Sequence, residues 1–172
     1  MQMNKFLRFL LPAAFALLCG ACSYKLAGTA QPLPFKTIAV KQVENNSYAP
    51  QASSPLTNQI GMRLSRSPAV ELVNLDDADV VLEIYLDDYA RRMIAGRADD
   101  TAVANVMDIT LTATCTLRYK SSGVALFEKV PVSVSSHVVD KGAGFVNAEY
   151  QNMTVLTGEL AKRIVDQVLG VW

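Results

Sequence analysis

"DITLTATCTLR", residues 108–118, alternates polar and apolar side chains without a break. Every second residue from Ile109 to Leu117 is apolar. Successive side chains of a strand point to opposite faces of the sheet, and aliphatic residues and threonine favour strands. The pattern therefore predicts an antiparallel strand with one buried face and one open polar face. The open face carries a ladder of four threonines, Thr110, Thr112, Thr114 and Thr116.

The segments on either side extend the same antiparallel sheet. Residues 120–123, "KSSG", predict a turn, and the strand expected over 124–135 contains Pro131. Proline has no N–H to donate, so this strand should lie at an edge of the sheet or be bulged there. On the N-terminal side, residues 80–89 alternate as a strand, whereas residues 90–104 lose the alternation and are expected to be a hairpin connection.

Two helices and two more strands complete the expected fold. A Ser-Pro pair starts a helix over about 54–66, and a second helix with one apolar face is expected from about Ala148 onward. Strands over 36–43 and 70–75 flank the first helix, so one parallel pair is plausible. This order predicts an α+β two-layer sandwich, with two helices on one face of a mixed, mostly antiparallel sheet of about four strands.

The N-terminus has the pattern of a secretion signal. Lys5 and Arg8 precede an apolar run of ~10 residues, too short for the ~20 that a bilayer span needs. Small residues then precede Cys22, and this stretch resembles a bacterial lipoprotein lipobox, whose cysteine is acylated and becomes the new N-terminus. One departure is Cys19, which stands where such motifs usually have leucine. A buried N-terminal helix and ordinary signal cleavage are the alternatives.

We therefore predict three parts for the chain. Residues 1–21 are a lipoprotein signal peptide, residues 22–36 a lipidated tether, and residues 37–172 a single domain. Several acyl chains on Cys22 would anchor the protein stably, since each buried methylene adds ~0.8 kcal/mol. Ser23 follows the cysteine, which by resemblance to enterobacterial sorting rules favours the outer membrane of a Gram-negative cell, with the domain on the periplasmic side.

The mature chain offers little catalytic chemistry. Removal of Lys5 and Arg8 leaves 14 of 16 basic residues against 16 acidic ones, a net charge of −2 that does not suggest nucleic acid. His137 is the only histidine, and Cys115 lies on the apolar side of its strand. Neither a metal-ligand set nor a reactive thiolate is expected from them. Nucleophile-elbow, phosphate-loop and zinc-protease motifs are absent. We expect no enzyme, no metal site and no cofactor.

Three arginines form the most distinctive cationic cluster. Arg91, Arg92 and Arg97 fall within seven residues, beside Met93 and Ile94. Guanidinium groups bind phosphates in bidentate fashion, and apolar neighbours can contact acyl chains. We hypothesise that the cluster binds a phosphorylated glycolipid such as lipopolysaccharide. The alternative is a solvated loop whose charges are balanced by nearby aspartates.

Several segments together resemble the lipopolysaccharide-assembly lipoprotein family LptE. They include the mature start "CSYKLAG", the strand and turn "IAVKQVENNSYAP", and the strand "DDADVVLEIYLDDY". The helix "SPLTNQIGMRLSRSPAVELVN", the strand "VMDITLTATCTL" and the final helix "NAEYQNMTVLTGELAKRIVDQVL" fit in the same order. Ser23 is a departure, because the family often has glycine there.

The resemblance implies a function without catalysis. Members of the family sit at the outer membrane, occupy the lumen of the LptD β-barrel as a plug, help the barrel to assemble, and assist insertion of lipopolysaccharide into the outer leaflet. No cofactor is implied. The threonine ladder could contact the polar barrel interior, or it could simply face solvent. The other readings are an envelope lipoprotein adaptor that activates a periplasmic enzyme such as a peptidoglycan synthase and, less favoured, a secreted enzyme.

Overall fold

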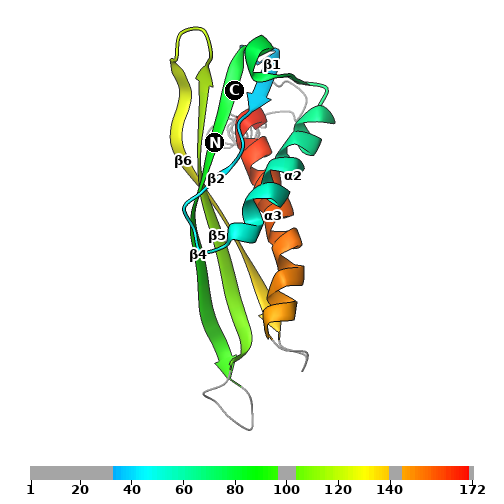
Figure 1. Ribbon diagram of the computed structural model, residues 1–172, viewed down its shortest axis with the longest axis vertical. Helices are drawn as coiled ribbons and strands as arrows, with labels where there is room; N and C mark the ends of the chain where they lie inside the picture. The colour runs from blue at the N-terminus through cyan, green and yellow to red at the C-terminus, as the bar shows by residue number, and fades with distance from the viewer. Residues whose placement is uncertain (1–32, 97–103, 140–144, 171–172) are drawn as a thin grey trace, which may run out of the picture. The chain divides into compact units, whose positions relative to one another are not determined.

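The computed structural model describes residues 33–96, 104–139 and 145–170, all within one compact unit. Two helices pack on one face of a single sheet (Figure 1). The N-terminal elements are β1 (Thr37–Val40), β2 (Glu44–Asn45), the 3-10 helix η1 (Pro50–Ala52), α2 (Ser53–Ser65), β3 (Glu71–Leu72) and the 3-10 helix η2 (Leu75–Asp77). The remaining elements are β4 (Val80–Gly96), β5 (Ala104–Tyr119), β6 (Ala125–Val139) and α3 (Phe145–Gly170). The predicted α+β sandwich is confirmed.

The sheet is mixed, as expected, but has more strands than predicted. Its order is β3-β1-β4-β5-β6, and β2 pairs with β4 beyond the end of β1. Strands β1, β2 and β3 form parallel pairs, whereas β4, β5 and β6 are antiparallel. The sheet has six strands where we expected about four. Strands β2 and β3 contain two residues each, too few to show a periodic pattern.

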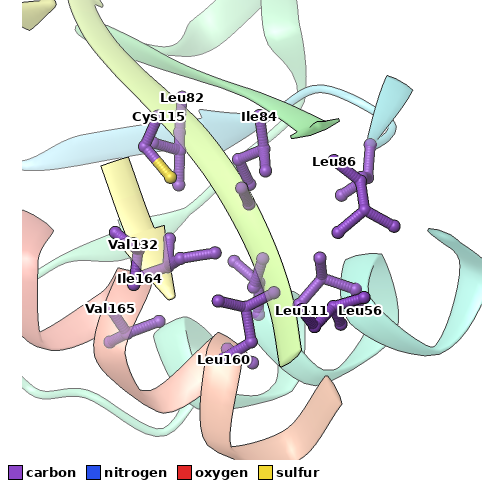
Figure 2. Packing of buried hydrophobic residues seen from close by; sticks show 14 of the residues in the cluster. Leu56, Leu82, Ile84, Leu86, Leu111, Cys115, Val132, Leu160, Ile164 and Val165 are labelled. Carbon is purple, nitrogen blue, oxygen red and sulfur yellow. The ribbon is translucent and has the colours of Figure 1, made fainter. Parts of the chain in front are cut away.

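The alternating segment forms the centre of the core. All five apolar residues from Ile109 to Leu117 are fully buried on the side of β5 that faces the helices. Helix α2 contributes a stripe that includes Leu56, and α3 a stripe that includes Leu160 and Ile164, all fully buried. Figure 2 shows these side chains interdigitating with those of β4 and β5. The face of β5 that carries the threonines is therefore the one without helices.

The β4–β5 hairpin is longer than the sequence indicated. We expected residues 90–104 to be a connection, but β4 continues to Gly96 and β5 begins at Ala104. Pairing continues through Arg92 opposite Asp108 and Met93 opposite Met107. Residues 90–95 are all exposed. Because this part of the hairpin is not covered, its pairing depends on backbone hydrogen bonds, which require no apolar alternation.

Strand β6 lies at the edge of the sheet, which confirms the position predicted from Pro131. The strand is also bulged nearby: the register shifts between Cys115 and Leu117, and Lys129 has a positive φ of 51°. A proline and a bulge are both features that discourage further strand pairing at an edge. The predicted turn before β6 contains Gly123 at a φ of 69°, a conformation that glycine adopts without a steric penalty.

The folded unit includes residues that the sequence assigned to the tether. Phe35 is 4% exposed and belongs to the core, and Leu33 packs against it. The predicted lipidation site, Cys22, and the predicted signal peptide lie outside the described residues. Within the described part of the chain, no helix has the length and apolar character needed to cross a membrane.

Candidate functional site

The candidate binding surface is the open face of the sheet, opposite the helices. Side-chain hydroxyls of β5 and β6 pair across this face: Thr110 Oγ1 lies 2.8 Å from Ser135 Oγ, and Thr112 Oγ1 lies 3.1 Å from Ser133 Oγ. We call these four residues, together with Thr114, the hydroxyl face. Thr110, Thr112, Ser133 and Ser135 satisfy one another while remaining accessible, so this part of the face is polar and carries no formal charge of its own.

The other two threonines differ in their surroundings. Thr114 donates a hydrogen bond from Oγ1 to Asp87 Oδ2 on β4. Thr116 is only 4% exposed, and its Oγ1 accepts a hydrogen bond of 3.1 Å from the N–H of Lys129 at the bulge of β6. The structure thus leaves three of the four predicted threonines accessible, and gives Thr116 a structural contact.

A charged cluster closes the hydroxyl face at the end nearest the hairpin turn of β5 and β6. Glu83 on β4 accepts from Lys41 Nζ at 2.6 Å and from Arg118 Nε at 3.2 Å. The hydrogen bond from Lys41 holds the pKa of the Glu83 carboxyl below its usual value. The same hydrogen bond raises the pKa of the Lys41 amine above its usual value. Both effects favour the charged forms, so this cluster stays ionised and ties β1, β4 and β5 together.

A second charged cluster lies at the opposite end of the same face. Asp108 on β5 has Arg92 Nη2 at 3.8 Å from Oδ2 and His137 Nδ1 at 3.3 Å from Oδ1. The Asp108 carboxylate is mostly buried, whereas the Arg92 and His137 side chains are largely exposed. The arrangement holds an arginine and an imidazole over one carboxylate, with their outer edges open to solvent.

The three predicted arginines do not form one patch on β4. Arg91 and Arg92 are consecutive residues of one strand, so their side chains lie on opposite faces and make separate ion pairs. Arg92 pairs with Asp108 on the open face, and Arg91 Nη1 lies 3.3 Å from Glu149 Oε2 of α3. Arg97 lies outside the described residues.

Arg91 belongs to a small cluster that joins the hairpin to α3. Its guanidinium carbon lies 5.7 Å from the centroid of the Tyr89 ring, and the Tyr89 hydroxyl donates to Glu149 Oε1. Burial and the hydrogen bond to Glu149 raise the pKa of Tyr89, so the phenol remains a donor. This cluster fixes the first turns of α3 against β4.

The cysteine lies in the hydrophobic core, and the described residues contain no candidate metal site. Cys115 is fully buried, and burial raises the pKa of its thiol to about 12, so it is a core residue as expected. Within residues 33–96, 104–139 and 145–170, no group of three or more His, Cys, Asp or Glu side chains could hold a metal ion.

A family model for lipopolysaccharide assembly, LptE, matches residues 35–169. This chain belongs to the LptE family. The match begins at the first buried residue before β1 and ends in the last turn of α3, so it covers all but the outermost residues of the folded unit. Membership gives the chain a role in lipopolysaccharide assembly, and it confirms the resemblance seen in the sequence.

Solved structures of bacterial proteins share the fold of this LptE member. A hypothetical protein from Chlamydia trachomatis has a TM-score of 0.59 at 11% identity, covering 79% of this chain and 96% of its own. The uncharacterized lipoprotein B from Nitrosomonas europaea has a TM-score of 0.58 at 13% identity, covering 86% of this chain and 91% of its own. The rare lipoprotein B from Shewanella oneidensis has a TM-score of 0.54 at 14% identity, covering 76% and 96%. No curated protein sequence matches significantly.

Sequence reasoning missed the ion pairs that join distant parts of the chain, one group at an end of the hydroxyl face and one between β4 and α3. Glu83 meets Lys41 and Arg118 across three strands, and Glu149 meets Arg91 from a distant helix. These pairs are separated by tens of residues, so no local spacing indicates them. The placement of Arg91 and Arg92 on opposite faces could have been predicted from the sequence. If the predicted strand had continued past Tyr89, its alternation would have put the two arginines on opposite faces.

Proposed function

We propose that this LptE member is a lipid-anchored outer-membrane protein that binds an LptD-type β-barrel and assists the insertion of lipopolysaccharide into the outer leaflet. The match to the family over residues 35–169 is the observation that carries this proposal. The protein acts by binding and positioning rather than by catalysis. Its partners are the barrel and the glycolipid, and it needs no cofactor.

The hydroxyl face is the proposed contact with the barrel wall. Interiors of large outer-membrane barrels are polar. A strand surface whose hydroxyls are already paired can exchange hydrogen bonds with such a wall without leaving donors unsatisfied. The charged clusters at Glu83 and Asp108 mark the two ends of the contact. We include Thr110, Thr112 and Thr114 in this contact. The fourth threonine, Thr116, contributes through the bulge it stabilises.

The proposed glycolipid contact is the outer end of the β4–β5 hairpin, where Arg91 and Arg92 lie on opposite faces of β4. Arg91 and Arg92 are both substantially exposed despite their acidic partners, and Met93 and Ile94 follow them as exposed apolar residues. Arg97, which lies outside the described residues, follows three positions after Ile94 in the sequence. Phosphate groups on lipopolysaccharide would bind the guanidinium groups, and its acyl chains would contact the apolar side chains.

The proposed anchor is a set of acyl chains on Cys22. The 11 residue steps from Cys22 to Leu33, the first described residue, would span at most ~40 Å when extended. The tether would therefore hold the domain close to the inner surface of the outer membrane. Mass spectrometry of the native N-terminus tests this part alone.

Depletion of the chain in its own bacterium tests the function. We expect lipopolysaccharide in the outer leaflet to fall, as measured by surface labelling, and expression of the wild-type chain to restore it. If surface lipopolysaccharide stays unchanged while peptidoglycan synthesis falls, the protein is instead an adaptor for a periplasmic synthase.

A further inference from the structure

An open pocket of about 700 Å³ lies at the end of the sheet where the described chain begins. Three segments line it: the residues before β1, the residues before β4, and the end of β5 with the turn that follows. Its volume is within the range of ordinary ligand sites. We call it the tether-end pocket. The lining residues that matter below are Leu33, Phe35, Lys36, Tyr119, Lys120 and Ser121.

The buried part of this lining is apolar and held in place. Phe35 is 4% exposed, and Leu33 and Tyr119 are half-buried and pack against the core. The N–H of Lys120 donates to the carbonyl oxygen of Asp79 at 2.9 Å, and the N–H of Lys36 donates to Asp79 Oδ2 at 2.9 Å. Two sides of the pocket are therefore fixed to one residue, so little ordering is needed when a ligand binds.

The exposed part of the pocket carries charges of both signs. Lys36 and Lys120 are exposed, and Lys120 Nζ lies 3.8 Å from Asp76 Oδ1, whose side chain is 99% exposed. The Lys36 amine has no ion-pair partner among residues 33–96, 104–139 and 145–170. Lysine amines bind phosphate groups as point charges. An exposed carboxylate beside them can bind an amine, so the rim offers complementary sites for both charges of a zwitterion.

The chain that leads to the proposed anchor enters the folded unit at this pocket. Leu33 lines the pocket and is the first described residue. The 11 residue steps back to Cys22 span at most ~40 Å. With acyl chains on Cys22, the pocket is therefore restricted to the neighbourhood of the phospholipid headgroups in the leaflet that holds them.

We propose that the tether-end pocket binds the headgroup of a zwitterionic phospholipid, such as phosphatidylethanolamine, in that leaflet; this rests on the anchor in the proposed function. The phosphate binds Lys36 and Lys120, and the headgroup amine binds Asp76. The first methylenes of the acyl chains contact Leu33 and Tyr119. An anionic headgroup without an amine fits less well, because the Asp76 carboxylate beside Lys120 repels it.

Native mass spectrometry of the full acylated chain, purified in detergent, tests the proposal. The wild type should retain added phosphatidylethanolamine better than phosphatidylglycerol, whose headgroup has no amine. Lys36→Gln with Lys120→Gln should reduce the retained phosphatidylethanolamine about tenfold. Asp76→Asn should remove the preference between the two lipids.

A matched variant controls for net charge. Arg66→Gln with Lys162→Gln removes the same charge from the helical side of the domain and should leave retention unchanged. The backbone N–H groups of Lys36 and Lys120 remain in the pocket variant, so its thermal unfolding should match the wild type. Equal retention of the two lipids by the wild type, or equal loss in the pocket and control variants, overturns the proposal.

A photo-crosslinking residue in native membranes provides the second measurement. Position 121 lines the pocket, and position 154, exposed in the middle of α3, is the control. Crosslinks to phospholipid from 121 and none from 154 support the proposal. Crosslinks from 121 only to lipopolysaccharide, to the barrel or to a second copy of the chain overturn it.

The mass of the purified chain separates this failure from that of the anchor. An acylated chain that retains no phospholipid contradicts the pocket assignment alone. An unmodified Cys22 overturns the proposed anchor and the pocket assignment together, while the binding of the barrel is tested separately by copurification.

Discussion

Asp79 and Thr37 hold each other by reciprocal hydrogen bonds at the start of the sheet. Asp79 Oδ2 accepts from the N–H of Thr37 at 2.9 Å, and the N–H of Asp79 donates to Thr37 Oγ1 at 2.8 Å. The same carboxylate oxygen also accepts from the N–H of Lys36 at 2.9 Å. The contact joins the first residue of β1 to the residue before β4, directly after the point where the proposed tether ends.

Asp79→Ala should destabilise the domain by about 1 kcal/mol. The substitution removes two hydrogen bonds to a carboxylate, and the exposure of the side chain keeps the effect at the low end for charged acceptors. Asp79→Asn retains one acceptor oxygen and should cost less. Chemical denaturation of the three proteins at neutral pH measures the order; an unchanged free energy of unfolding for Asp79→Ala would show that the contact is not stabilising.

The same pair predicts a pH dependence. Hydrogen bonds from the N–H groups of Lys36 and Thr37 lower the pKa of Asp79 in the folded protein. A lowered pKa means that the contribution is fully present above the unfolded value of ~3.9 and is lost as the pH falls through the folded value. The difference in stability between wild type and Asp79→Ala should therefore be constant from pH 7 to 5 and shrink as the pH falls below about 4. A difference that does not change with pH contradicts the assignment.

Leu160→Ala should destabilise the domain by about 3 kcal/mol. Leu160 is fully buried between α3 and the sheet, and removal of its branched carbons leaves a cavity among tightly packed neighbours (Figure 2). The exposed Leu75 provides the control, since Leu75→Ala should change the stability by less than about 0.5 kcal/mol. Equal effects of the two substitutions would contradict the placement of the core.

Much of this fold could be predicted from the sequence, because burial of one face of a strand or helix makes apolar residues recur at regular spacing. The alternation from Ile109 to Leu117 correctly predicted the two faces of β5. The apolar residues spaced three and four apart around Leu160 correctly predicted the buried face of α3. The distal half of β4 could not be predicted, because residues 90–95 are exposed and nothing selects apolar residues there. The two-residue strands β2 and β3 are held by pairing with distant strands rather than by their own pattern.

The candidate surface was only partly predictable for the same reason. The four threonines were correctly assigned to one face of β5, because a strand places alternate residues together. Which of them are accessible depends on the bulge at Lys129, which brings a backbone N–H to Thr116. The arginines were grouped by closeness in sequence, whereas the strand directs Arg91 and Arg92 to opposite faces.

Charged residues in the middle of the hydroxyl face should weaken binding of the barrel. Thr112→Arg with Thr114→Arg replaces two paired hydroxyls by bulky cations, and we expect copurification of the barrel to fall about tenfold. Ser121→Arg adds a cation at the exposed β5–β6 turn and serves as the control. Unchanged copurification of the double variant, with its fold intact by circular dichroism, would mean that this face does not contact the barrel.

Removal of the three arginines should reduce binding of lipopolysaccharide. Alanine at Arg91, Arg92 and Arg97 removes charged donors that we propose for its phosphates, so the affinity of the full chain in detergent should fall about tenfold or more. A matched variant with alanine at Lys36, Arg66 and Lys162 loses the same charge elsewhere on the surface. If both variants bind equally, net charge rather than this cluster determines binding.

Native mass measurement of the complex purified from detergent-solubilised outer membranes tests the central claim most directly. The account predicts one copy of this chain, with its N-terminal acyl groups, bound to one copy of a large LptD-type β-barrel. Recovery of the chain alone, or in complex with a peptidoglycan synthase and without any barrel, would contradict it.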